Sequence, residues 1–394
     1  MMKRLLTPFV LTISAILALG YAYIAWRLTS TSGQRWLLAI PFAMVWIVPV
    51  VYWVFEREST SGTDDLLHAT SYLCMGWINF LIVLSLARDA LLWVTSWLPA
   101  TDRIHVLLEN AGGLMVFAGS VAALGLGALA ALRGPHVRRV DIPVDGLDAG
   151  LQGFRIVLIS DLHVGPIIGA RYVRRVVRMT NELAPDLIAL TGDIVDGSVA
   201  RLARHVAPLA ELVPKEKAFL VLGNHDYYSG AGPWIAQFQK MGLHVLLNSH
   251  ALITRGSARM VVGGVVDPAV HFYDAQQTPR PDLAAAPEVG SAFRLLLAHN
   301  PKLAPLAERA GFDLQLSGHT HAGQFFPWTL AVHLLHTPHV AGLSRCGRLQ
   351  VYVSAGTGSW GPPVRFGTVP ELTLLHLTRV SPPPQISEST RSET

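Results

Sequence analysis

Residues 154–165 read Phe-Arg-Ile-Val-Leu-Ile-Ser-Asp-Leu-His-Val-Gly, the pattern of a buried strand followed by two side chains that can bind a cation. The apolar, β-branched run at 156–159 has the length of a buried strand, and Gly165 predicts a turn soon after it. Asp161 and His163 therefore follow the strand's carboxyl end. Because they lie two residues apart on an extended segment, a carboxylate oxygen and a ring nitrogen can converge on one cation.

Four later apolar runs end in residues of the same kinds. The runs at 187–190, 219–222, 295–298 and 314–316 each predict a further buried strand. The polar residues that follow them are, in order, Asp193 and Asp196; Asn224, His225 and Asp226; His299; and His319 and His321. In an α/β sheet the carboxyl ends of such strands share one edge, where ligands bind. The sequence therefore predicts an α/β domain with a polar site at that edge.

The first third of the chain is too apolar for a soluble enzyme. The chain has 394 residues, of which 51% are hydrophobic and 15% charged, and the apolar excess lies before Arg133. The runs at 5–26, 36–55, 71–98 and 111–132 each approach or exceed the roughly 20 residues that span a bilayer. The first run begins like a signal peptide but lacks a clear small-x-small cleavage site, so we expect it to remain as an anchor. About four transmembrane helices over residues 1–139 are predicted.

The basic residues around these runs predict the orientation. Four spans place two unequal sets on opposite sides of the membrane: Lys3, Arg4, Arg57, Arg133, Arg138 and Arg139 on one, and Arg27, Arg35 and Arg103 on the other. The positive-inside rule then predicts a multi-pass protein of the cell membrane whose large domain is cytoplasmic. Arg88 and Asp89 are adjacent in the third run, which either ends near Leu86 or carries an intramembrane ion pair with a role.

Residues 140–380 are long enough for one sizeable core, and residues 381–394 have the composition of a disordered tail. The segment 170–183 predicts a helix with one apolar face. Its other face carries four arginines, Arg171, Arg174, Arg175 and Arg178. This basic stripe is either a solvated helix face or a contact with anionic lipid.

The five polar segments together resemble the calcineurin-like metallophosphoesterase superfamily. In order they read Asp-x-His, Gly-Asp-x-x-Asp, Gly-Asn-His-Asp, a single His and Gly-His-Thr-His. The segments 317–324 and 354–366 resemble more narrowly its membrane-associated YkuE/YaeI-type branch. The resemblance implies an αββα sandwich and a metal-dependent phosphoric ester hydrolase over residues 140–380.

The resemblance also implies a pair of divalent metal ions, of Mn, Fe or Zn. Its ligands would be Asp161, His163 and His321 for the first ion, Asn224, His299 and His319 for the second, and Asp193 bridging the two. Oxygen and imidazole ligands without thiolate suit a catalytic site better than a structural zinc site. The two oxygens of one carboxylate can serve two ions about 3.5–4 Å apart.

The catalytic roles implied by the resemblance centre on His225, which would give a proton or hydrogen bond to the phosphoryl group attacked by a metal-activated water. Asp226 could orient His225, and Asp196 could hold a ligand histidine; turn or helix-capping roles are the alternatives. Arg365 is predicted to bind a second phosphate, the alternative being a pairing with Glu371 or a backbone carbonyl.

The sequence thus predicts a membrane-anchored dinuclear-metal phosphoesterase. Its substrate would carry a phosphodiester or pyrophosphate bond, in a phosphorylated small molecule, a lipid or a lipid precursor such as UDP-diacylglucosamine. A non-catalytic membrane sensor or scaffold is disfavoured by the intact ligand set. A nuclease is disfavoured because the basic residues form no groove with interleaved aromatic residues. A transporter is disfavoured by the scarcity of ionisable residues within the apolar runs.

Overall fold

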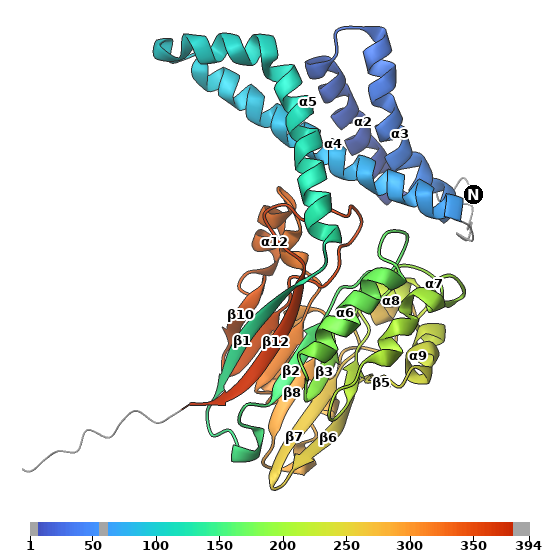
Figure 1. Cartoon of the computed structure of the whole chain (residues 1–394), viewed down its shortest axis with the longest axis vertical. Helices are drawn as coiled ribbons and strands as arrows, with labels where there is room; N and C mark the ends of the chain where they lie inside the picture. Colours follow the sequence, from blue (N-terminus) through green and yellow to red (C-terminus); the bar gives the residue numbers. More distant parts are fainter. Residues whose placement is uncertain (1–6, 55–61, 381–394) are drawn as a thin grey trace, which may run out of the picture.

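The computed structural model of the chain describes residues 7–54 and 62–380. Four long helices gather at one end of the molecule, and an α/β domain built on two sheets forms the other end (Figure 1). The predicted tail at 381–394 lies outside the described residues. So do Lys3, Arg4 and Arg57, on which the predicted orientation partly rests.

The four helices correspond to the four predicted apolar runs. They are α2 (Pro8–Leu28), α3 (Ser32–Val54), α4 (Gly62–Thr95) and α5 (Asp102–Leu132). Each is long and apolar enough to cross a membrane. At 1.5 Å per residue, the 34 residues of α4 and the 31 of α5 extend about 50 and 46 Å, well beyond a hydrocarbon core of about 30 Å. Both helices can therefore extend beyond the hydrocarbon core and make contacts outside it.

Polar contacts join three of these helices. α4 runs without interruption through Arg88 and Asp89, which do not pair with each other. Asp89 accepts hydrogen bonds from Tyr23 Oη at 2.8 Å and Arg27 Nε at 3.0 Å, both on α2. Arg88 Nε instead donates to the carbonyl of Leu108 on α5 at 3.1 Å. Part-buried polar contacts of this kind fasten apolar helices to one another.

Two six-stranded sheets form the α/β domain. The first has the order β1 (His136–Val144), β12 (Glu371–Arg379), β2 (Arg155–Ile159), β3 (Leu187–Leu190), β4 (Ala218–Leu220) and β5 (His244–Val245). The second has the order β10 (Gly342–Cys346), β11 (Leu349–Val353), β9 (Leu314–Ser317), β8 (Phe293–Leu297), β7 (Ala258–Gly264) and β6 (Ser249–Arg255). Within them, β2 to β5 are mutually parallel, as are β7, β8, β9 and β11.

Helices cover the outer face of each sheet, which gives the predicted αββα sandwich. The first sheet is covered by α6 (Ala170–Glu182), α7 (Val199–Val206) and α9 (Ala231–Lys240), and the second by α10 (Pro281–Ala284) and α11 (Ala304–Arg309). On α6 the predicted apolar face is buried, including Tyr172, Val173, Val176 and Val177. The four arginines of its basic stripe are exposed.

Strand β2 shows why an unbroken apolar run was needed. Ile156 and Leu158 lie in the core between the sheets, whereas Val157 and Ile159 lie in the core under the helices. Successive side chains of a strand point to opposite faces, so a strand buried on both faces must be apolar throughout. Asp161 follows two residues after the end of this strand, on the edge where the site forms.

The helical part and the sandwich are closely joined. β1 pairs with β12 from His136 onward, so the predicted boundary between residues 139 and 140 falls inside this edge strand. Phe80 of α4 packs against Phe325, with ring centroids 5.9 Å apart, and Asn79 Nδ2 donates to the carbonyl of Phe326 at 3.0 Å. These contacts hold the loops at the carboxyl edge of the second sheet against α4.

Candidate metal centre

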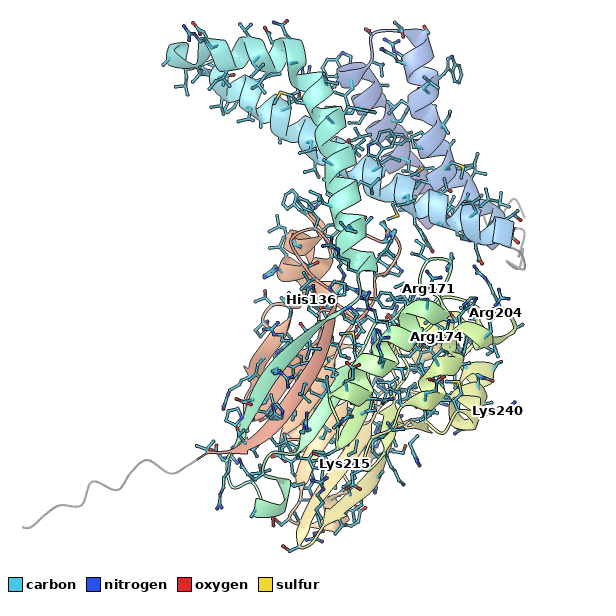
Figure 2. The ribbon with its side chains drawn as sticks, in the orientation of Figure 1. His136, Arg171, Arg174, Arg204, Lys215 and Lys240 are labelled. Carbon is cyan, nitrogen blue, oxygen red and sulfur yellow. The ribbon has the colours of Figure 1, made fainter. Side chains whose placement is uncertain are left out.

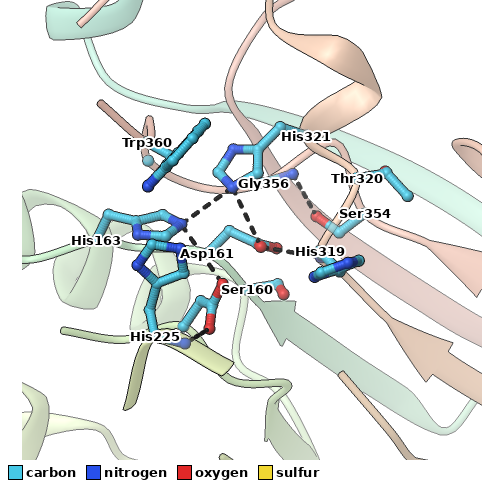
Figure 3. Close-up of polar contacts among 12 residues, drawn as sticks. Ser160, Asp161, His163, His225, His319, Thr320, His321, Ser354, Gly356 and Trp360 are labelled. Atoms are coloured by element: carbon cyan, nitrogen blue, oxygen red, sulfur yellow. Dashed lines mark hydrogen bonds and ion pairs between the residues drawn. The ribbon is translucent and has the colours of Figure 1, made fainter. Parts of the chain in front are cut away.

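The residues predicted to bind metal come together where strand ends of the two sheets meet. Figure 3 shows His163, His225, His319 and His321 arranged around Asp161. Three groups each place one possible ligand atom per residue within 4.8 Å of the others: Asp161, His163 and His321; His163, Asp193 and His225; and Asp193, His299 and His319. Shared residues connect the three groups into one cluster.

The first group has ring nitrogens and a carboxylate directed at a common centre. His321 Nε2 lies 3.3 Å from Asp161 Oδ1 and 3.0 Å from His163 Nε2. The carboxylate of Asp161 is fully buried, and its Oδ2 has no hydrogen-bond partner among the described residues. A buried carboxylate oxygen without a donor is costly. A cation between these atoms would satisfy it.

The third group joins Asp193 to His299 and His319. His299 Nε2 is 3.1 Å from Asp193 Oδ2, and His319 Nδ1 is 3.2 Å from His299 Nε2 and 3.1 Å from Asn224 Oδ1. The same Oδ2 atom of Asp193 lies 3.8 Å from His163 Nε2 in the first group. Asp193 therefore occupies the middle of the cluster, where a bridging ligand would have to be.

The backbone of the cluster is strained. Asp161, His163, Asp193, His319 and His321 all have φ between +50° and +73°, in the left-handed region that side chains other than glycine seldom adopt. Such residues gather at functional sites, where the surrounding structure holds them against a cost of about 1–3 kcal/mol each.

Two glycines of the sequence motifs permit the close packing around the carboxylates. A methyl group at Gly223 would overlap Asp193 Oδ1, and one at Gly318 would overlap Asp161 Oδ2. Glycine is needed at both positions because the loops after β4 and β9 pass directly over the two carboxylates. The Gly-Asn-His and Gly-His-Thr-His motifs thus have a steric basis as well as a chemical one.

Hydrogen bonds fix the orientation of two of the candidate ligand histidines. His163 Nδ1 lies 3.0 Å from Asp196 Oδ2, and His299 Nδ1 lies 2.8 Å from the carbonyl oxygen of Thr191. Each contact leaves Nε2 pointing into the cluster, the usual arrangement for metal-binding histidines. Asp196 thus contacts a candidate ligand histidine, His163, which is one of the two roles predicted for it. The Thr191 carbonyl was not foreseen, since a backbone group leaves no signal in the sequence.

His225 is oriented by Asp196 and not by the adjacent Asp226. Its Nδ1 lies 2.8 Å from Asp196 Oδ1, and its side chain remains partly exposed at the rim of the cluster. Asp226 is fully buried and accepts hydrogen bonds from the backbone amides of Gly223, Ile194 and Val195 at 2.9–3.1 Å. Burial, together with the charge of Asp193, raises the pKa of Asp226 to about 7. Asp226 therefore braces two loops, and this corrects the predicted contact with His225.

Arg365 is buried away from any position where it could clamp a phosphate. Its side chain is 1% exposed, and Nη1 donates to the carbonyls of His321 at 2.9 Å and Ala355 at 2.7 Å. Nη2 donates to the carbonyl of Gly358 at 2.6 Å. These contacts match the alternative prediction, in which Arg365 pairs with a backbone carbonyl. The predicted binding of a second phosphate by Arg365 is therefore corrected. Arg365 holds the loop that carries His321.

The electrostatics of the cluster favour a bound cation. Burial lowers the pKa of His319 to about 3 and of His321 to about 4, so both rings are neutral at pH 7 and can act as ligands. Burial opposes ionisation of Asp193, but His299 and His163 outweigh it and hold its pKa at about 2. Burial also lowers the pKa of His163, yet the nearby carboxylates, Asp196 first, raise it to about 9. A cation would displace that proton on binding.

Some residues near the cluster were not predicted from the sequence. Trp360 packs edge-on against His225 with ring centroids 5.7 Å apart, and about half of its side chain is exposed. Met75 of α4 and Trp328 line a hollow beside His319 and His321. Trp360 lies in a segment singled out for its family resemblance, but that resemblance assigned it no role. Met75 gave no signal, because an apolar helix does not reveal which side faces protein.

Comparisons with known proteins agree with the geometry. The family model "Calcineurin-like phosphoesterase" matches residues 154–323. "Transmembrane protein with metallophosphoesterase domain" of Danio rerio is 32% identical over 402 residues, which cover 93% of this chain and 88% of that protein. The protein of the same name in Bos taurus is 33% identical over 400 residues, with the same coverage. "Phosphodiesterase YaeI" of Escherichia coli is 32% identical over 240 residues, 57% of this chain and 82% of that protein.

Proposed function

Because the chain belongs to the calcineurin-like metallophosphoesterases, as a membrane-associated, metal-dependent hydrolase of phosphoric esters, we propose that it cleaves a phosphodiester or pyrophosphate bond in a lipid or lipid precursor. UDP-diacylglucosamine is the specific example we propose. The observation that carries this proposal is the position of the histidine cluster directly beside the apolar helices. His321 is four residues before Phe325, which packs on Phe80 of α4.

The proposed metal centre holds two divalent cations. The first is held by Asp161, His163 and His321, the second by Asn224, His299 and His319, and Asp193 is shared. The unpartnered Oδ2 of Asp161 and the facing nitrogens of His163 and His321 support this assignment. When bound, such a pair supplies an acidified water and offsets the negative charge of the phosphoryl group.

His225 is the proposed proton donor to the leaving oxygen. It lies at the rim of the cluster, and its Nδ1 is held by Asp196 at 2.8 Å, so Nε2 remains for the substrate. Asp196 also holds His163, which keeps the donor and a metal ligand in register. A positioned acid of this kind contributes about 10²–10⁴-fold to a rate.

We also propose that the four helices cross the membrane and that the α/β domain is cytoplasmic. Arg133, Arg138 and Arg139 follow α5 and would lie on that side. Arg171 and Arg204 lie at the end of the α/β domain nearest the helices, whereas Lys215 lies at the far end (Figure 2). Basic residues close to the membrane suit the anionic cytoplasmic leaflet, at about 1 kcal/mol each.

The test uses the full chain in detergent, stripped of metal with a chelator and reloaded separately with Mn²⁺, Fe²⁺ or Zn²⁺. The substrates are lipids with a phosphomonoester, a phosphodiester or a pyrophosphate, and the products are followed by mass spectrometry. We expect metal-dependent cleavage of a diester or pyrophosphate lipid, lost in Asp193→Asn. Metal binding without cleavage of any lipid would favour the sensor alternative and overturn the proposal.

A further inference from the structure

A cavity of about 230 Å³ adjoins the histidine cluster on the side of the apolar helices. His319 and His321 form part of its wall at the polar end. The rest of its wall is mainly apolar: Met75, Phe325, Trp328, Val332, Trp360 and Pro362. Met75 comes from α4, whereas Trp328 and Val332 come from α12 (Trp328–His336). The helical part and the α/β domain thus build this cavity jointly.

The remaining polar side chains of the wall are already paired with the protein's own backbone. Gln324 Nε2 donates to the carbonyl of Trp360 at 2.9 Å, and its Oε1 accepts from the amide of Trp360 at 2.8 Å. Thr320 Oγ1 donates to the carbonyl of Val340 at 2.6 Å. Beyond the histidines, the cavity therefore offers an apolar surface to whatever enters it.

No lysine or arginine occurs among the described residues that line the cavity. A site for the polar part of a soluble nucleotide or polyphosphate would need such donors. An apolar hollow that meets metal ligands at one end instead suits an amphiphile. Its phosphate would lie at the histidines and its hydrocarbon among Met75, Trp328 and Trp360.

The outer surface of α12 continues the apolar face of the helical part. Trp328 is 50% exposed, Leu334 77% and Leu335 65%. Figure 1 shows α12 at the end of the α/β domain that faces the long helices. The segment that leads into α12 is attached to α4 through Phe325 and Phe326. Exposed leucines and a tryptophan on a short helix at this level are typical of a segment lying in the membrane surface.

We propose that the cavity is an acyl-chain subsite, entered from the bilayer past α12. This subsite proposal rests on the proposed function. It restricts the substrate to one whose scissile phosphate is attached to a hydrocarbon chain that the cavity receives. The substrate is then drawn from the membrane, with its head at the metal centre and its chain against α4.

The experiment measures kcat/KM of the metal-loaded full chain in mixed micelles for one phosphodiester series whose single acyl chain is lengthened stepwise. Bis(p-nitrophenyl) phosphate, which has no acyl chain, is measured in parallel. We expect kcat/KM to rise with chain length until the cavity is filled. Each methylene that packs against the cavity wall adds to kcat/KM, though by less than on transfer from water, because the chain leaves a micelle that is itself apolar.

Val332→Trp, which fills the cavity, should shorten the optimal chain and lower the ratio of long-chain to short-chain kcat/KM by about tenfold or more. Val332→Ala should shift the optimum towards longer chains. Val213→Trp is the matched control, since Val213 is an exposed valine that does not line the cavity and its substitution should leave the ratio unchanged. Metal content and the rate with bis(p-nitrophenyl) phosphate identify variants that fail to fold.

A wild-type profile that is flat with chain length would overturn the subsite while leaving phosphoesterase activity in place. An unchanged optimum in both Val332 variants, at normal metal content, would also overturn it. If the proposed function itself were wrong, the result would differ: no member of the series would be hydrolysed in a metal-dependent way.

Discussion

The backbone amide of Arg365 donates a hydrogen bond to the carbonyl oxygen of Gly127, at 2.9 Å. Gly127 lies in the last turns of α5, and the guanidinium of Arg365 holds the carbonyl of His321 at 2.9 Å. A single residue thus links an apolar helix to the loop of a proposed metal ligand. We therefore expect the proposed metal centre to be sensitive to the packing of α5.

Enlarging Gly127 should weaken metal binding from a distance. A Cβ at this position would lie 2.6 Å from Val364 Cγ1, so Gly127→Leu must push the loop of Arg365 away from α5. We expect lower metal content and lower turnover in the purified full chain. Gly125→Leu is the control, because a Cβ at Gly125 meets nothing within 4 Å. Equal effects of the two substitutions would contradict the link.

Arg365→Lys should destabilise the loop without impairing substrate binding. A lysine ammonium cannot replace the planar guanidinium, so buried carbonyls of Ala355 and Gly358 would lose their donors at about 1–3 kcal/mol each. We expect a lower thermal midpoint and lower metal affinity, with KM little changed once metal is saturating. A large rise in KM at normal stability would restore the phosphate-binding role.

His225→Ala should separate proton donation from metal binding. His225 is not one of the proposed ligands, so bound metal should stay near the wild-type level while kcat falls by about 10²–10⁴-fold. Asp226→Asn is the comparison. Because Asp226 braces the backbone, this substitution should lower the thermal midpoint and leave the kcat of the folded protein less affected. Parallel loss of metal and activity in His225→Ala would mean that its role is structural.

Removing metal should destabilise the α/β domain. The bare site leaves Oδ2 of the buried Asp161 without a hydrogen-bond partner among the described residues, and a ligand at 100 times its Kd stabilises a native state by about 2.7 kcal/mol. The thermal midpoint of the full chain in detergent should fall on chelation and recover when metal is restored. The fall should be much smaller in Asp193→Asn, which binds little metal from the start. A midpoint that is indifferent to chelation would argue against the metal pair.

Placing charge on α12 should impair access to lipid in a bilayer. Leu334→Glu combined with Leu335→Glu removes two exposed leucines, each worth about 1.5–3 kcal/mol if buried in lipid. We expect slower hydrolysis of lipid in proteoliposomes, with a smaller effect in detergent micelles. Leu252→Glu, at an exposed position on β6 far from the helices, should have no such effect. If the double variant lost the same fraction of the wild-type rate in both assays, α12 would not lie in the membrane surface.

The sandwich core could be predicted because its information is local. The run at 156–159 is apolar on both faces because β2 lies between two cores, and Leu187–Leu190 was predicted with its observed bounds for the same reason. Parallel strands bring their carboxyl ends to one edge, so the approach of Asp161 and Asp193, which follow β2 and β3, was predictable from topology. His299 follows β8 in the other sheet, so its approach depends on how the two sheets pack.

The contacts of His225 and Arg365 could not be predicted because they depend on loop geometry. Asp226 is adjacent to His225 in sequence, but it lies at the start of a short helix and turns inward to three backbone amides. Asp196, from another loop, reaches His225 instead. Arg365 was predicted to bind an anion because arginine is seldom buried, and its contacts with the carbonyls of His321, Ala355 and Gly358 become visible only in three dimensions.

Asp196 gives the two halves of the chemistry a common anchor, since its carboxylate contacts both His163 and His225. A change in the charge of one ring therefore changes the interaction of this carboxylate with the other ring. If His163 binds metal and His225 donates a proton, as proposed, the two functions share this one positioning contact. Asp196→Asn should therefore lower both metal affinity and turnover, and loss of only one of the two would show that the contacts act separately.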